Sequence, residues 1–269
     1  MAFPDDPLTG PPPAEVPLPD APLVHVLAQV RFPRILMIGT DSAFIAPFQE
    51  SIRDGYPHLR QEQTREVRLD GGGDPVPGEP RRAWRFLDAN ERWRVSLTPD
   101  FLSLETTAYG SRTDFFGRLR GLVEALGEHV RPGSVERLGI RYVNRVRGET
   151  AGRIRELVRP EVAGVLGTSV AARLTHALTE CAFEPEEEST TLLARWGALP
   201  PGATVDASVM DPVDDPSWIL DLDMFSNGTL AFDADVVMDE AERYFRRLYT
   251  VFRWAVTDDF LRHHGGDPS

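Results

Sequence analysis

The chain has 269 residues, of which 41% are hydrophobic and 26% charged, and all 29 of its basic residues are arginine. The absence of lysine excludes enzymes that depend on a phosphate-loop lysine or on a Schiff base, since both need a primary amine. A single cysteine, Cys181, allows no intramolecular disulfide, and no apolar run approaches the ~18 residues that span a bilayer. The start of the chain has no secretory signal pattern, so we expect a cytoplasmic protein with no membrane partner.

The formal net charge of -13 is unevenly distributed. Residues 81–160 contain 16 arginines and 10 acids, whereas the segments before and after them are acidic. We favour pairing of these opposite charges within one fold. An anion-binding surface in the middle segment is the alternative.

Residues 1–20 contain seven of the 23 prolines and few large apolar residues, which predicts a flexible tail. Residues 21–133 are expected to form a first α+β half. Its strands are predicted from two-residue alternation and its helices from capping residues and apolar spacing. The predicted elements are a strand at Leu23–Phe32, a helix from Ser42 to Gly55, strands at His58–Leu69, Arg82–Leu87, Trp93–Leu97 and Phe101–Thr107, and a helix from Ser111 to Pro132, with a flexible loop at residues 70–80.

Residues 134–265 are expected to form a second α+β half of the same globular domain. The predicted elements are strands at Val135–Val146, Ala171–Phe183, Thr190–Trp196, Trp218–Phe225 and Thr229–Phe232, and helices at Ala151–Leu166, with a break at Pro160, and at Val236–Leu261. The order of elements resembles that of the first half. We therefore predict an α+β fold with an internally duplicated, mainly antiparallel sheet and two long helices packed on one face.

Four segments carry a family resemblance: PLVHVLAQVRFP from Pro22, DFLSLETTAY from Asp100, RLGIRYVNRV from Arg137, and the aromatic helix that ends in VTDDF. Together they resemble a sporadically distributed family of uncharacterised bacterial proteins. Members of that family usually carry an acid at the position of His25. The patchy distribution implies genes that travel with defence or toxin clusters, which is an association and not a mechanism.

Arginines line one side of the strand that begins near Val135. Side chains alternate along a strand, so Arg137, Arg141 and Arg145 share one face at spacings of about 7 Å or its multiples. Arg92 and Arg94 lie on another predicted strand, and these five arginines are the candidate binding residues. They could bind phosphate or a nucleic-acid backbone. We favour the alternative that they pair with acids across the sheet, with Asp221 and Asp223 as the partners.

Asp221 and Asp223 could instead hold a metal ion, since two carboxylates on one strand face suit magnesium or manganese. Structural pairing is the favoured interpretation of this common pattern. No histidine or cysteine spacing typical of zinc occurs, and no nucleotide-binding or GxSxG pattern lies in the right context. Cys181, in a predicted strand, is expected to be a buried thiol. We assign no catalytic residue, no metal site and no cofactor.

The leading functional hypothesis is therefore a non-enzymatic protein-interaction or accessory module, whose partner is another protein or a second copy of the chain. Two alternatives stay open. One is an anion or nucleic-acid binder that uses the arginine face. The other is a metal-dependent enzyme that uses Asp221 and Asp223.

Overall fold

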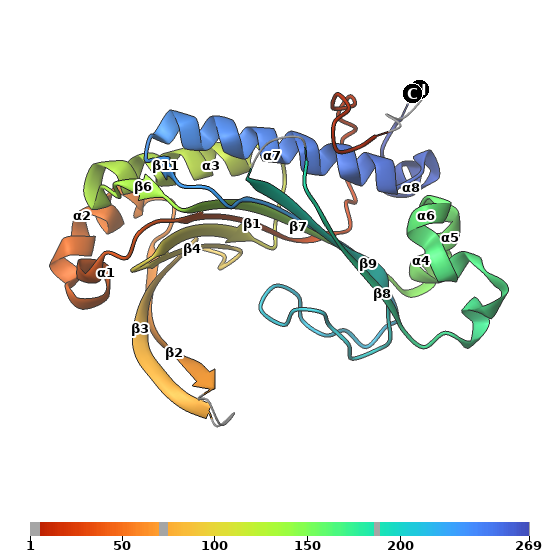
Figure 1. Ribbon diagram of the computed structural model, residues 1–269, viewed down its shortest axis with the longest axis horizontal. Coiled ribbons are helices and arrows are strands. Elements are labelled where there is room, and N and C mark those ends of the chain that lie inside the picture. The colour runs from red at the N-terminus through yellow and green to blue at the C-terminus, as the bar shows by residue number, and fades with distance from the viewer. Residues whose placement is uncertain (1–5, 70–74, 186–188, 269) are drawn as a thin grey trace. The chain divides into compact units, whose positions relative to one another are not determined.

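The structure, a computed structural model, describes residues 6–69, 75–185 and 189–268. The fold is α+β, as predicted, and it is dominated by a nine-stranded antiparallel sheet in the order β2-β3-β4-β5-β1-β7-β10-β9-β8 (Figure 1). The strands are β1 (Leu23–Arg31), β2 (His58–Leu69), β3 (Pro75–Leu87), β4 (Trp93–Thr98), β5 (Phe101–Thr106), β6 (Ser134–Val135), β7 (Arg137–Arg147), β8 (Ala177–Phe183), β9 (Thr190–Leu199), β10 (Ser217–Ser226) and β11 (Leu230–Ala231). The helices are α1 (Leu36–Thr40), α2 (Ser42–Ile52), α3 (Arg112–Ala125), α4 (Gly148–Gly152), α5 (Ile154–Leu157), α6 (Pro160–Ala163), α7 (Ala234–Ala255) and α8 (Asp258–His263).

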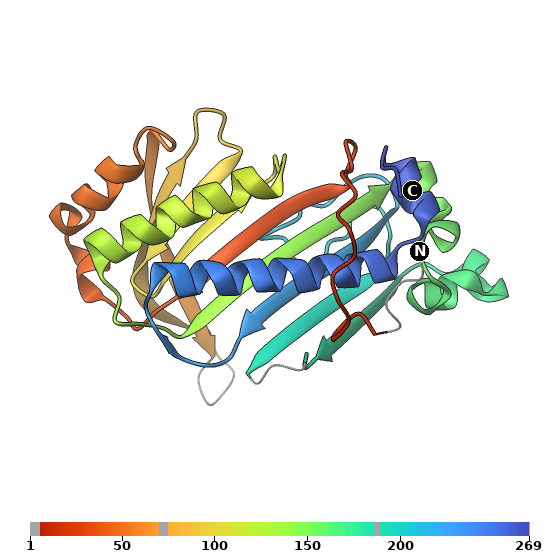
Figure 2. The ribbon, with the colours of Figure 1, turned by 90° about the horizontal axis from the view of Figure 1, so that it is seen from above.

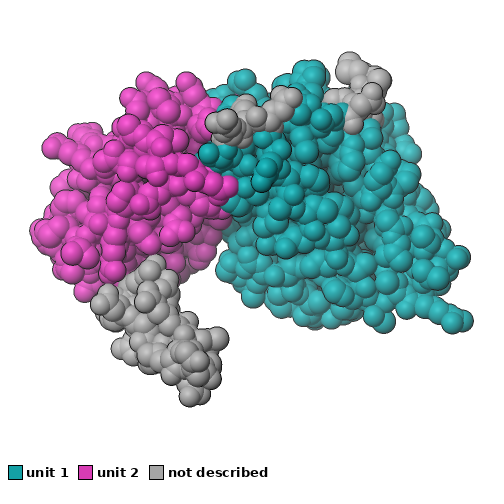
Figure 3. All heavy atoms as spheres, viewed as in Figure 1, with its two compact units in different colours: residues 1–26, 140–226, 242–269 teal, residues 27–139, 227–241 magenta. Residues whose placement is uncertain are grey.

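The chain divides into two compact units, and neither is continuous in sequence (Figure 3). Unit 1 contains residues 1–26, 140–226 and 242–269, and unit 2 contains residues 27–139 and 227–241. Each unit therefore takes segments from both of the halves expected from the sequence.

The core of unit 1 forms between the sheet and the part of α7 that begins at Glu242. Tyr244 and Leu248, four residues apart on one face of α7, are buried, as is Trp218 on β10. Tyr142 of β7 meets Phe245 of α7 edge to face, with ring centroids 5.7 Å apart. Tyr142 therefore faces α7, and the odd-numbered arginines of β7 lie on the opposite face, as the alternation predicts.

Unit 2 is built in a similar way around α3. Ser111 caps this helix, because its hydroxyl accepts a hydrogen bond of 3.1 Å from the Asp114 amide. Phe115, fully buried, packs against Trp93 of β4 with ring centroids 5.9 Å apart. The predicted cap and apolar face of this helix are confirmed.

Several predicted elements differ from the structure. The helical segment expected at Ala151–Leu166 breaks at Pro160 as predicted, where α6 begins, but it is divided further into α4 and α5, and Val158 before the break forms an isolated β-bridge with Val256. The helix expected to run to Leu261 ends at Ala255, and Thr257 caps the separate helix α8 by accepting from the Phe260 amide at 3.3 Å. The strand expected from Ala171 begins at Ala177, after a 3-10 turn at Ser169–Arg173.

Two predicted segments lie partly outside the described residues. The loop expected at residues 70–80 is wrong for its second half, because β3 begins at Pro75, and residues 70–74 are not described. The acidic run Glu184–Glu188 predicts a solvated turn, of which residues 186–188 lie outside the described part of the chain.

The outermost strand of unit 1, β8, comes unusually close to its neighbour β9 at one glycine. Gly197 has φ of 157°, and a Cβ atom there would lie 2.0 Å from the backbone oxygen of Ala177. A side chain therefore has no room at this position, and only glycine allows the close pairing of the two strands.

The described part of the proline-rich tail lies against the C-terminal helices of unit 1. It crosses α7, as Figure 2 shows. The Tyr249 hydroxyl accepts a 2.7 Å hydrogen bond from the Val16 amide, and Arg247 donates to the carbonyl oxygens of Pro7 and Gly10 at 3.0 and 2.9 Å. Leu18 lies close to Gly266 near the C-terminus. Proline fixes the extended backbone in advance, which lowers the entropy lost when the tail docks.

We expect Tyr249→Phe to loosen the tail from α7, because the Val16 amide loses its acceptor. The free energy of unfolding should fall by about 0.5–1.5 kcal/mol in urea titrations. Limited proteolysis should cut residues 6–20 faster in this variant than in the wild type. Arg246→Gln, an exposed change on the same helix, serves as the control. Equal cleavage rates in all three proteins would contradict a docked tail.

Candidate functional site

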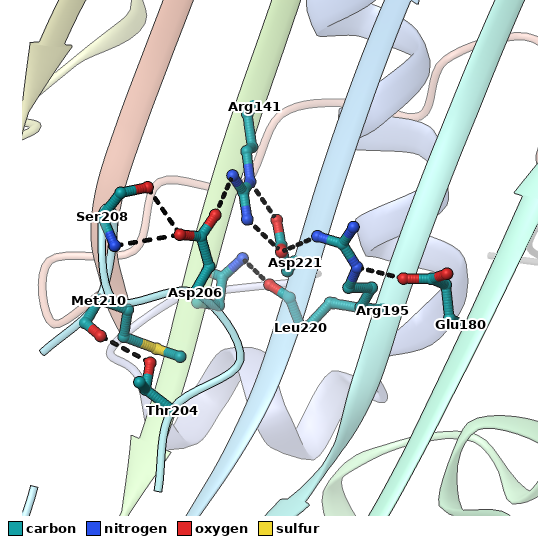
Figure 4. Close-up of polar contacts among 10 residues, drawn as sticks. Arg141, Glu180, Arg195, Thr204, Asp206, Ser208, Met210, Leu220 and Asp221 are labelled. Carbon is teal, nitrogen blue, oxygen red and sulfur yellow. Dashed lines mark hydrogen bonds and ion pairs between the residues drawn. The ribbon is translucent and has the colours of Figure 1, made fainter. Parts of the chain in front are cut away.

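A ladder of alternating charges crosses four neighbouring strands of unit 1, on the face of the sheet opposite α7 (Figure 4). We call Arg141 on β7, Asp221 on β10, Arg195 on β9 and Glu180 on β8 the charge ladder. Asp221 lies directly opposite Arg195, and Arg195 directly opposite Glu180, in the strand registers. Unlike charges thus face each other at every step, which is the stabilising arrangement for cross-strand pairs.

Arg141 and Asp221 form the buried centre of the ladder. The side chain of Asp221 is 2% exposed and that of Arg141 is 10% exposed. Arg141 donates from Nε to Asp221 Oδ1 at 2.8 Å and from the second terminal nitrogen to Oδ2 at 2.7 Å. Arg195 adds a longer contact of 3.4 Å to Oδ2. This fork geometry uses two donors of one planar guanidinium, which a lysine could not supply.

The third nitrogen of Arg141 reaches a loop that covers this face of the sheet. It donates to Asp206 Oδ2 at 3.0 Å, and Ser208 donates to the other oxygen of Asp206 at 2.6 Å. Figure 1 shows the loop between β9 and β10 on the side of the sheet opposite α7. Met210 from this loop is buried in a small apolar cluster with Val143, Leu199 and Ile219. Arg141 therefore joins the sheet to its covering loop.

Further along β7, arginines bind the same loop through other groups. Arg145, which is buried, donates to the backbone oxygens of Asp211 and Ala203. Arg147, which is exposed, contacts the Asp215 carboxylate at 3.1 Å. The loop carries four aspartates and no basic residue between Pro200 and Pro216, so its charge complements the arginines beneath it.

Hydrogen bonding favours the ionised forms of Arg141, Asp206 and Arg195. Burial opposes the charge on Arg141, but the hydrogen bonds and negative charges of Asp221 and then of Asp206 outweigh it and raise the pKa of Arg141 above its ordinary value. Partial burial likewise opposes ionisation of Asp206, yet hydrogen bonds from Ser208 and Arg141 lower its pKa. The hydrogen bond to Glu180 is the main reason that the pKa of Arg195 is raised.

The five arginines predicted to bind a ligand do not all belong to this ladder. Arg141 pairs with Asp221, as the favoured interpretation expected. Arg145 binds backbone oxygens and does not use the predicted partner Asp223. Arg92, Arg94 and Arg137 belong to unit 2: Arg94 forms a two-pronged pair with Glu105 at 2.6 and 2.7 Å, Arg137 donates to Gln29 at 3.3 Å, and the side chain of Arg92 is exposed.

The carboxylates proposed as a metal pair have different surroundings. Asp221 is buried and held by two arginines, whereas Asp223 is only half-buried. In the described part of the chain, no three His, Cys, Asp or Glu side chains are grouped so that they could hold a metal ion. A cation at Asp221 would have to displace Arg141, so this carboxylate suits charge pairing better than metal binding.

Sequence reasoning missed three members of the site. Arg195 and Glu180 sit on predicted strands, and two-residue alternation could have placed Arg195 on a charged face. Asp206 comes from an irregular loop, whose path no periodic signal predicts. Cys181, expected to be buried, is half-buried because β8 has a strand neighbour on one side only.

A scan of protein-family models finds no match to this chain, and a search of curated proteins finds no similar sequence. Within the described residues, no helix is both long and apolar enough to cross a membrane. The functional assignment therefore depends on the geometry of the chain itself.

We expect Asp221→Asn to lower the free energy of unfolding by roughly 3–5 kcal/mol, because it leaves the buried Arg141 guanidinium without its main counter-charge. The double variant Arg141→Met with Asp221→Leu should lose less free energy of unfolding than the sum of the losses in its two single variants, Arg141→Met and Asp221→Leu. A double-mutant cycle by urea denaturation measures this coupling. The exposed pair Arg147 and Asp215 is the matched control, with an expected coupling of about 0–1 kcal/mol. Equal coupling in both pairs would contradict a central role for Arg141 and Asp221.

Asp206→Asn should destabilise the protein in a pH-dependent way. The pKa of Asp206 is lower in the folded state than the unfolded value of about 3.9, so its contribution is fully present above that value and is lost as pH falls through the folded-state pKa. Urea unfolding should give a difference from wild type of about 1 kcal/mol at neutral pH, vanishing in strong acid. Asp214→Asn, on the same loop, is the control. A difference that stays constant with pH would contradict the ionic contact.

Proposed function

We propose that this protein is a non-enzymatic interaction module that binds another protein as an accessory factor. The observation that carries the proposal is the saturation of Arg141 at the centre of the charge ladder: every nitrogen of its guanidinium donates to a carboxylate of the same chain. Such a group is engaged in pairing within the sheet and is not poised for acid–base or nucleophilic chemistry. On the same unit, the apolar side chains of Val165, Val170 and Leu178 are 38%, 60% and 40% exposed. Exposed apolar groups favour a protein partner.

Two further parts of the proposal concern origin and location. We infer that the chain arose by internal duplication, which the order of elements supports: strand, helices, several strands and a long helix occur twice, ending in α3 and in α7. In each repeat the long helix would cover the same face of its strands. Membership of the sporadic bacterial family is part of the same proposal, as is a cytoplasmic location, with which a single unpaired cysteine agrees.

Binding of nucleic acid is the second candidate, favoured by the arginines of β7. The acidic loop at Pro200–Pro216 argues against it, since this loop already occupies the positions that phosphates would take on Arg141 and Arg145. A polyanion would have to displace a segment of the same chain. A metal-dependent enzyme that uses Asp221 and Asp223 would require an equivalent displacement of Arg141.

The test is co-purification of the full-length protein with the product of its neighbouring gene. We expect a complex on size-exclusion chromatography that survives a several-fold increase in salt, since apolar contacts are little screened. In parallel, fluorescence anisotropy with a labelled DNA duplex should show no binding. The proposal is overturned if DNA binds with an affinity that falls steeply with salt. A rise in melting temperature with Mg²⁺ or Mn²⁺ that Asp223→Asn removes would overturn it in favour of the metal enzyme.

A further inference from the structure

The strand β8 forms an open edge of unit 1. It pairs with β9 from Ala177 to Phe183, and among the described strands no other strand lies beside it. Every second residue of such an edge points its backbone N–H and C=O groups away from the sheet. These groups are ready to pair with another extended chain.

The opposite end of the strand order shows how an edge is ordinarily protected. The edge strand β2 has the sequence HLRQEQTREVRL, in which charged residues recur, and its pairing with β3 is irregular between Arg65 and Val67. Arg60 and Glu62 form ion pairs with Glu91 and Arg85 there. Charges and irregularities of this kind prevent strands from adding to an edge. By contrast, β8 reads ALTECAF, with one charge, no proline and an unbroken register with β9.

A surface depression accompanies the open edge. It has a volume of about 500 Å³ and is lined by side chains of β8, the end of β9 and the covering loop, among them Leu178, Glu180, Leu199, Val205 and Asp206. Leu178 and Glu180 are two residues apart and so share one face, at a spacing of about 7 Å. An added strand on the outer side of β8 would therefore place alternate side chains beside Leu178 and Glu180, at the rim of this depression.

The lining of the depression determines which side chains fit. Leu178, Leu199 and Val205 supply an apolar part. The carboxylates of Glu180 and Asp206 are 57% and 30% exposed, whereas the side chain of Arg195 between them is 25% exposed and is already bound to Glu180 and Asp221. The exposed side chain of His176 also lines the depression. Among the carboxylate and guanidinium groups of the lining the acids predominate at the surface, and they complement a basic side chain.

We infer that β8 accepts an extended segment of a partner protein as an additional strand, with a lysine or arginine placed opposite Glu180 and an apolar residue two positions away opposite Leu178. This inference rests on the proposed function and names the surface and the partner chemistry. Main-chain hydrogen bonds to β8 supply affinity, and the alternate side chains supply specificity. Pairing with a second copy of β8 centred on Glu180 would place two carboxylates opposite each other, which is unfavourable.

The probe is the capped peptide Thr-Lys-Thr-Leu-Thr-Val-Thr. Its controls are a version carrying glutamate for lysine and two versions carrying proline, one for the threonine between lysine and leucine and one for the leucine. Isothermal titration with the full-length protein should show the lysine peptide binding roughly five- to tenfold more tightly than the glutamate peptide, and no binding of the proline peptide that lacks an N–H facing β8. Amide hydrogen exchange should slow at residues 177–183 on binding. Glu180→Gln should remove the preference for lysine, whereas Glu161→Gln, an exposed acid away from the edge, should keep it.

Two adjacent proline variants test the backbone pairing itself. Successive residues of a strand direct their N–H groups to opposite sides, so one of Thr179→Pro and Glu180→Pro removes a free N–H and the other removes one that bonds β9. The variant that keeps the wild-type melting temperature should lose peptide binding. If that variant still binds, or if the peptides bind without protection of residues 177–183, the inference is wrong. If both prolines unfold the chain, the Glu180→Gln result and the exchange data decide.

The outcomes also separate this inference from the proposed function. A partner complex that forms equally well with the folded proline variant would refute the edge site and leave the interaction module standing. Failure to form any partner complex, with no peptide binding, would overturn both. Light scattering that gives a dimer, lost in the folded proline variant, would identify a second copy as the occupant and overturn the assignment to a partner protein.

Discussion

A buried carboxylate in the middle of a sheet has to be matched by positive charge, and Asp221 sets this requirement for unit 1. Arginines on both neighbouring strands pair with it: Arg141 of β7 donates two short hydrogen bonds, and Arg195 of β9 makes a longer contact. Removing an ion from water costs several kcal/mol, so the pair adds little net stability compared with apolar residues of the same size. Its value lies in specificity, because any arrangement that separates the pair is strongly disfavoured.

The register of three strands follows from that pairing. A slip of one residue would turn Asp221 toward α7, into the apolar layer that contains Tyr244 and Leu248. The same requirement fixes the covering loop, since the remaining nitrogen of Arg141 needs an acceptor and finds it in Asp206. The guanidinium of Arg141 can bind Asp221 and Asp206 at the same time because its donors lie in one rigid plane. At this position, therefore, arginine has a role that lysine could not fill.

Periodic patterns predicted much of this architecture. The strand around Arg141, its two faces, the capped helix after Ser111 and the pairing of Arg141 with Asp221 all follow from alternation, apolar spacing and the need to balance charge. Features that depend on contacts between distant segments were not accessible. The break at Pro160 was expected, but the β-bridge that joins Val158 to Val256 was not. No periodic pattern predicts that the loop around Asp206 turns back over the sheet. The tail was expected to be flexible because it contains few large apolar residues, yet Tyr249 and Arg247 bind its backbone, which composition does not describe.

The pairing of the edge strand β8 in unit 1 depends on Gly197. Strand β8 is held against β9 only because position 197 has no side chain, and the backbone oxygen of Ala177 fills the space that a methyl group would need. A side chain at this one position would clash with the backbone of β8, whereas Arg141 and Asp221 lie on β7 and β10. The outer edge of unit 1 and its charged centre therefore depend on different positions of the sequence, and a mutation in one codon is enough to alter the edge.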